Sequence, residues 1–150
     1  MPAFVTFGRI LFAVLFIYTG ATKLIAIQAT ANLIAGRIVV PDVIAPYAKQ
    51  VETATAMTTP QLLAIAVGGL EVIAGLMIAL NFGARFFAAL MVIYVAVSTV
   101  LFSDFWNQTA PDNAMVVIDA LKNLSIIGAL FMIMGYGRVT RPAEAAYGDV

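Results

Sequence analysis

The sequence has 150 residues, a formal net charge of zero, 63% hydrophobic residues and only 11% charged residues. Soluble domains contain roughly 25% charged residues, so this composition cannot cover a soluble surface, and it offers no basic stripe for nucleic acid. Histidine and cysteine are absent. Their absence excludes disulfides, thiolate metal sites, His-ligated haem and histidine acid–base chemistry within this sequence. The composition indicates a chain embedded in a lipid bilayer.

Four apolar segments are each long enough for a helix across the roughly 30 Å hydrocarbon core of a bilayer. They predict an all-α membrane protein, a single four-helix bundle with spans at about 5–27, 61–80, 86–102 and 114–134. Asn81-Phe82-Gly83 predicts a tight turn, so the second and third spans should be antiparallel neighbours. Thr59 and Pro60 are the predicted N-cap and first residue of the second span, and Asp112 or Asn113 the cap of the fourth.

The connection from Gln28 to Thr59 is too long to be structureless in a compact protein. Leu33, Ile34 and Ile38 give it an apolar side, and two prolines interrupt it. We expect a capping segment of one or two short helices lying over the ends of the spans. A re-entrant segment is the alternative.

The basic residues predict the orientation of the chain. Arg9, Arg85, Arg138 and Arg141 fall on the side of the two termini and the short turn. Arg37 and Lys49 fall on the opposite side, in the long connection. Because cytoplasmic loops carry the excess of basic residues, both termini are predicted to be cytoplasmic.

Glu71 is the acidic residue near the middle of the second span. A charged carboxylate at that depth costs a few kcal/mol or more unless it is paired or faces a polar cavity. Gly68 and Gly75 lie on the same helix face and would let a neighbouring helix approach closely. Glu71 should therefore point into the protein and meet a partner.

Depth along each helix, at about 1.5 Å per residue, predicts which charges meet. Glu71 and Lys122 are both near the midplane, and Lys23 and Asp119 are both nearer the outer side. We therefore expect Glu71 to pair with Lys122, and Lys23 with Asp119, which leaves the interior neutral. Arg9 is a competing partner for Glu71, and Asn123 could complete the hydrogen bonds. Such a cluster is either a structural polar core or a site for a polar head group or a proton path.

Several of these patterns occur together in one known family. They are the first helix with Arg9 and Gly20-x-x-Lys23, the Gly69-Leu70-Glu71 segment, the turn from Asn81 to Arg85, and Lys122-Asn123. With these residues the chain resembles the DoxX family of small bacterial membrane proteins. The resemblance implies a four-helix protein of the bacterial inner membrane, with relatives linked to thiosulfate:quinone oxidoreductase and to membrane-bound oxidoreductase complexes. It implies quinone-linked redox chemistry. The residues themselves include no ligand for a redox cofactor, so any electron carrier would be a quinone or belong to a partner.

Three functions remain open from the sequence. In the first, a subunit of a quinone-linked oxidoreductase uses Glu71, Lys122 and Lys23 to bind a quinone carbonyl, with Tyr18 or Tyr94 as further donors. In the second, a small proton-coupled transporter uses Glu71 as its coupling acid, in a homo-oligomer or around an open cavity.

The third is a structural subunit of a larger membrane complex. The third span carries no charge, and Ala88, Ala89 and Ala96 would form its docking face. The sequence does not decide whether the chain is itself an enzyme.

Overall fold

The computed structural model describes residues 3–38, 40–103 and 114–136. Six helices form within them: α1 (Ala3–Ile25), α2 (Ile27–Ala35), α3 (Ala45–Thr55), α4 (Thr59–Ala79), α5 (Ala84–Phe102) and α6 (Ala114–Tyr136). Among these, α1, α4, α5 and α6 are long and apolar enough to cross a membrane. The prediction of an all-α protein with four membrane-spanning helices is confirmed. The predicted caps Asp112 and Asn113, and the basic residues Arg138 and Arg141, lie outside the described residues.

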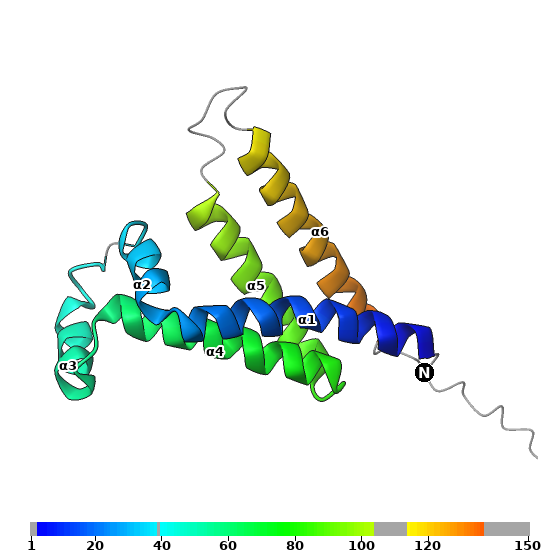
Figure 1. Ribbon diagram of the computed structural model, residues 1–150, viewed down its shortest axis with the longest axis horizontal. Helices are drawn as coiled ribbons and strands as arrows, with labels where there is room; N and C mark the ends of the chain where they lie inside the picture. Colours follow the sequence, from blue (N-terminus) through cyan, green and yellow to red (C-terminus); the bar gives the residue numbers. More distant parts are fainter. Residues whose placement is uncertain (1–2, 39, 104–113, 137–150) are drawn as a thin grey trace, which may run out of the picture.

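The four long helices form two pairs. α1 packs along α4, α5 packs along α6, and the pairs join where α4 contacts α5. The α5–α6 pair diverges from the α1–α4 pair with distance from the α4–α5 turn, so that the two pairs form a V (Figure 1). The short helix α2 packs on α4 beside the open end of this V.

The α1–α4 contact depends on glycine. A β-carbon added to Gly20 on α1 would lie 2.6 Å from the carbonyl oxygen of Gly68 on α4. A β-carbon on Gly75 would lie 2.9 Å from Cγ1 of Ile17. Real β-carbons do not approach other atoms so closely, so these positions let the two helix backbones come nearer than larger residues would permit. The close approach predicted at Gly68 and Gly75 is confirmed, with α1 as the neighbour.

The turn between α4 and α5 has the predicted tightness. Asn81 and Gly83 both have positive φ angles, of 61° and 57°, which asparagine and glycine tolerate better than other residues. Gly83 is the N-cap of α5. The chain therefore reverses within a few residues, and α4 and α5 run antiparallel.

The long connection forms the two short helices α2 (Ile27–Ala35) and α3 (Ala45–Thr55), which agrees with the expected one or two short helices. The predicted start of α4 is wrong by one residue: Thr58 is the N-cap, and its N–H donates to Oε1 of Gln61 at 2.9 Å. Gln61 also donates to Gln28 at 2.8 Å, which ties α2 to the start of α4. The cap therefore rests on one end of α4.

Glu52 joins α3 to the same helix end. The hydroxyl and the backbone N–H of Thr59 both donate to Oε1 of Glu52 at 2.6 Å. The side-chain hydrogen bond from Thr59, and then the backbone one, hold the pKa of the Glu52 carboxyl below its usual value. A carboxylate at this position also complements the positive end of the α4 dipole.

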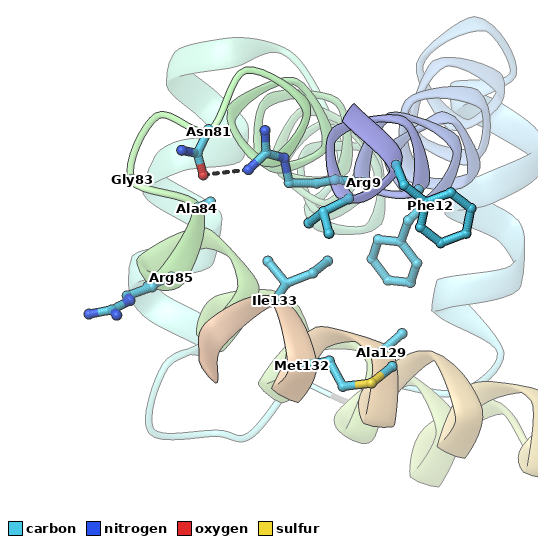
Figure 2. A pocket seen from close by; sticks show the side chains of 12 residues that line it. Arg9, Phe12, Asn81, Gly83, Ala84, Arg85, Ala129, Met132 and Ile133 are labelled. Carbon is cyan, nitrogen blue, oxygen red and sulfur yellow. Dashed lines mark hydrogen bonds between the residues drawn. The ribbon is translucent and has the colours of Figure 1, made fainter. Parts of the chain in front are cut away.

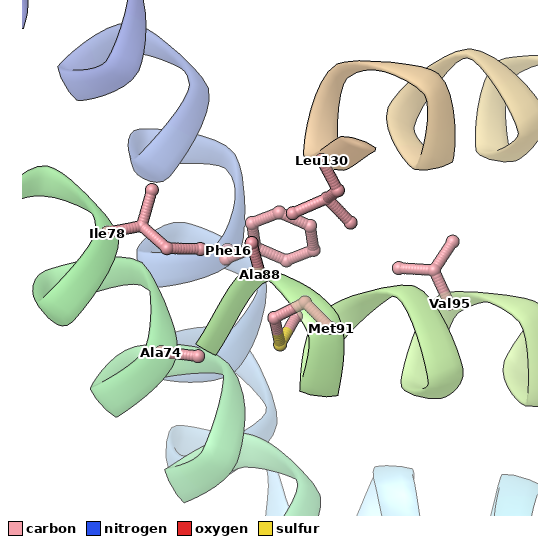
Figure 3. Close-up of a cluster of buried hydrophobic side chains, with 7 residues drawn as sticks. All are labelled: Phe16, Ala74, Ile78, Ala88, Met91, Val95 and Leu130. Carbon is pink, nitrogen blue, oxygen red and sulfur yellow. The ribbon is translucent and has the colours of Figure 1, made fainter. Parts of the chain in front are cut away.

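The apolar core lies near the apex of the V, where all four long helices meet. It consists of Phe16, Ala74, Ile78, Ala88, Met91, Val95 and Leu130 (Figure 3). Ala88 is fully buried there, so it is not part of an outward docking face as the structural-subunit hypothesis expected. Ala89 and Ala96 are partly exposed.

Candidate ligand-binding site

Glu71 is a buried carboxylate at the centre of the α1–α4 contact. Its side chain is 4% exposed, and Nζ of Lys23 lies 2.8 Å from both of its oxygens. The Lys23 side chain is 28% exposed, so the ammonium reaches the carboxylate from a more open side. Two opposite charges with this geometry form a neutral pair, which is the arrangement that a low-dielectric interior tolerates.

Lys23 reaches Glu71 because of the direction of its side chain. Its position on α1 is close to the C-terminal end of that helix, opposite residues of α4 nearer the helix start than Glu71. In a helix the Cα–Cβ bond tilts toward the N-terminus, so a long side chain covers the preceding turn. The Lys23 ammonium is therefore displaced toward the level of Gly20, which lies directly against Glu71.

Tyr94 on α5 completes the cluster. Its hydroxyl donates a hydrogen bond to Oε1 of Glu71. The α4–α5 hairpin accounts for this meeting, because Glu71 precedes the turn by about as many residues as Tyr94 follows it. From the sequence, Tyr94 is a candidate donor to a quinone and not a predicted partner of Glu71. The equal spacing of the two residues about the turn is the signal that could have placed them together.

The two predicted ion pairs are wrong. Glu71 does not pair with Lys122, and Lys23 does not pair with Asp119. Instead, Nζ of Lys122 lies 3.0 Å from Oδ1 of Asp119 on the same helix, and the two side chains are 67% and 60% exposed. The predicted pairs rested only on the depth of each residue in the membrane. In the structure α6 packs on α5 and diverges from the α1–α4 pair, so the polar side chains of α6 do not reach Glu71.

Arg9 and Asn123 are also absent from the Glu71 cluster. Nη1 of Arg9 donates to Oδ1 of Asn81 at 2.6 Å, which ties α1 to the α4–α5 turn. No hydrogen bond joins Asn123 to Glu71 within residues 3–38, 40–103 and 114–136. Tyr18, the other predicted donor, is 69% exposed on α1.

A cavity of about 380 Å³ adjoins the cluster at the open end of the V. Lys23, Tyr94 and Ser98 contribute polar groups to its lining. The rest of the lining is mostly apolar and comes from α2, the segment just after it, α4 and α5: Leu33, Ile34, Ile38, Leu63, Val67, Val97, Leu101 and Phe102, with Thr30. Ligand pockets are typically apolar cavities of about 300–1,000 Å³ with a few convergent polar groups. We call this space the outer pocket.

Chemically, the outer pocket offers hydrogen-bond donors to a ligand oxygen. An ammonium group has three N–H donors, and Glu71 takes two of those of Lys23. Within the described part of the chain there is no group of three residues that could hold a metal ion. The remaining N–H of the Lys23 ammonium can donate to a ligand that carries a hydrogen-bond acceptor.

A model of the DoxX family matches residues 4–104, well over half of the sequence. The chain belongs to the DoxX family. It is thus a DoxX-family membrane protein with four apolar helices. The comparisons find no match among curated proteins or among solved structures. The matched range spans α1 to α5 and so includes Lys23, Glu71 and Tyr94, whereas Asp119 and Lys122 on α6 lie beyond it.

Proposed function

We propose that this DoxX-family protein is the membrane subunit of a quinone-linked oxidoreductase of the bacterial inner membrane. In this proposal the outer pocket holds the quinone head group. The observation that carries it is that Lys23 and Tyr94 both contact the buried Glu71 carboxylate and both line a mostly apolar cavity.

The donor set fits a quinone. A quinone ring is apolar on its faces and has two carbonyl oxygens that accept hydrogen bonds. The aliphatic residues of α2 and α4 would pack on the faces of the ring, and the Lys23 ammonium would donate to a carbonyl oxygen. Glu71 would hold that ammonium in place, and the open end of the V would let an isoprenoid tail pass to the lipid.

A bound quinone can accept two electrons and two protons. Lys23 and Tyr94 both carry exchangeable protons in the lining of the pocket, and Glu71 links them. Because the sequence has no histidine and no cysteine, we assign the electron source to a partner protein in a larger membrane complex. We further propose that both termini are cytoplasmic, which places the outer pocket on the opposite side of the membrane.

Equilibrium dialysis of the detergent-solubilised protein against a short-chain quinone tests this proposal. Tyr94→Phe removes only the hydroxyl, and Lys23→Met removes the ammonium. Each is expected to weaken binding by roughly tenfold: Lys23→Met removes a donor to the ligand, and Tyr94→Phe removes the hydrogen bond that holds Glu71 and, through it, the Lys23 ammonium. Tyr18→Phe is the matched control, since Tyr18 lies outside the pocket. Equal affinity in wild type, Tyr94→Phe and Lys23→Met would count against the site.

A small proton-coupled transporter is the second candidate. The observation that favours it is the presence of cavities toward both ends of the bundle, with the buried Glu71 between them. Single cysteines introduced at Gly8 and Val97, one in each cavity, would report on access in a chain with no native cysteine. A transporter requires their labelling to change in opposite directions when a proton gradient is imposed. Constant labelling would exclude alternating access.

A further inference from the structure

A second and larger cavity lies at the other end of the molecule, near the apex of the V. Its volume is about 660 Å³, and it is bounded by the first half of α1, the α4–α5 turn and the last third of α6 (Figure 2). We call it the inner pocket. It does not include Lys23, Glu71 or Tyr94, so the proposed quinone site leaves it unexplained.

The inner pocket is positively charged. Arg9 lies in its wall, with its guanidinium directed toward the turn and Nη1 bonded to Asn81 (Figure 2). Arg85 also lines the cavity, and Gly83 and Ala84 bring the N-terminus of α5 to it. The N-terminus of a helix carries a partial positive charge and favours anions. None of the described residues that line this cavity is acidic.

Arg9 and Arg85 have different positions relative to the cavity. The guanidinium of Arg9 is held by Asn81, whose positive φ angle fixes it in the turn. The Arg85 side chain is exposed and points away from Arg9 at the edge of the site (Figure 2). Arg9 is therefore the preorganised contact for an anion, and Arg85 would have to change its side-chain direction to reach the same anion.

The remaining walls are apolar. Phe4, Val5 and Phe12 come from α1, and Met132 and Ile133 come from α6. Phe4 and Met132 are 84% and 71% exposed, so the apolar wall opens toward the surroundings. A free inorganic anion would make no use of this surface, whereas an acyl chain would cover it. The cavity thus combines a cationic end with an apolar trough.

We propose that the inner pocket is a specific site for an anionic phospholipid. The phosphate lies against Arg9 at the start of α5, and an acyl chain lies along α1 and α6. Basic pockets between membrane helices on the cytoplasmic side are a recognised way of binding anionic head groups, and the predicted orientation puts this end there. The proposal stands independently of the quinone site, because the two cavities share no lining residue.

Native mass spectrometry of the protein in detergent tests the site, with added phosphatidylglycerol or phosphatidylcholine carrying the same acyl chains. Wild type is expected to bind the first phosphatidylglycerol about tenfold more tightly than phosphatidylcholine. Arg9→Gln should remove most of this preference, and Arg85→Gln should reduce it less. Arg37 follows α2, away from the inner pocket, so Arg37→Gln should leave the preference for phosphatidylglycerol unchanged.

A steric variant tests the same site without changing any charge. A β-carbon added to Gly8 meets nothing within 4 Å, so Gly8→Leu can be accommodated and would fill the pocket. It should lower phosphatidylglycerol binding several-fold, while Gly69→Leu, also at an open position but outside both cavities, should not. This comparison remains decisive if Arg9→Gln fails to fold.

Inorganic phosphate separates a lipid site from a simple anion site. We expect that millimolar phosphate does not displace phosphatidylglycerol. Full displacement by phosphate would overturn the assignment to a lipid. Equal affinity of wild type for the two lipids, or unchanged binding in both Arg9→Gln and Gly8→Leu, would overturn the site itself.

Discussion

Gly20 lies directly against Glu71: a β-carbon built on Gly20 would be 2.8 Å from the β-carbon of Glu71. The buried carboxylate and the closest approach of α1 to α4 are thus the same place in the structure. Any residue larger than glycine at position 20 would push the helices apart where Lys23 must reach Glu71. The packing of small residues and the polar cluster therefore depend on each other.

Gly20→Ala is expected to destabilise the protein by about 1–3 kcal/mol, because the added methyl group overpacks a close helix contact. Gly69→Ala is the control. The space at Gly69 is open, and alanine favours a helix over glycine by up to about 1 kcal/mol, so this variant should be neutral or slightly more stable. Thermal unfolding in detergent measures both. Equal stability of the two variants would show that α1 and α4 are not in close contact at Gly20.

Lys23 and Glu71 should be energetically coupled. Lys23→Met leaves a buried carboxylate without its cation, which costs roughly 2–4 kcal/mol, toward the low end of buried pairs because Lys23 is partly exposed. Lys23→Met combined with Glu71→Gln removes both charges and should be less destabilised than Lys23→Met alone. A double-mutant cycle of unfolding free energies measures the coupling. Purely additive effects would mean that the two side chains do not interact.

The same cycle made with Lys122→Met in place of Lys23→Met should show no coupling to Glu71. Lys122 contacts Asp119 instead, in an exposed pair. Coupling between Lys122 and Glu71 would restore the pairing that depth along the helices predicts.

A structural feature could be predicted from the sequence when it depends on residues that are close together along the chain. Span positions and the α4–α5 turn depend on local composition, and the helices lie within about two residues of the predicted spans. Glu71 could be recognised as buried because a lone carboxylate in an apolar span has few other options. Its partners could not be assigned, because depth fixes only one coordinate of a side chain. The neighbour relations of the helices and the direction of the Lys23 side chain supply the others.

Acid should weaken the contact between α3 and α4. The folded pKa of Glu52 is below its usual value, so its hydrogen bonds with Thr59 stabilise the contact at pH values above the usual carboxyl pKa. That stabilisation is lost as the pH falls through the lower, folded pKa. Amide exchange of α3, corrected for intrinsic rates, should therefore accelerate relative to α4 in acid. Glu52→Gln should remove this pH dependence, and an unchanged acid response in that variant would assign the effect elsewhere.

The predicted orientation can be checked with cysteine labelling, because the sequence has no native cysteine. A membrane-impermeant maleimide added to intact spheroplasts should label a cysteine introduced at Lys49, on α3, and not one introduced at Arg85, beside the α4–α5 turn. Both sites should react after the membrane is opened. Labelling of the Arg85 position alone in intact spheroplasts would invert the topology.

The most direct test of the account is mass spectrometry of the small molecules that co-purify with the gently solubilised protein. Wild type should carry a quinone, Glu71→Gln and Tyr94→Phe should lose most of it, and Lys122→Gln should retain it, with all variants checked for folding. This pattern would establish a quinone site at the Lys23–Glu71–Tyr94 cluster. A folded wild-type protein without quinone, or one whose quinone is unaffected by Glu71→Gln, would contradict the proposed function.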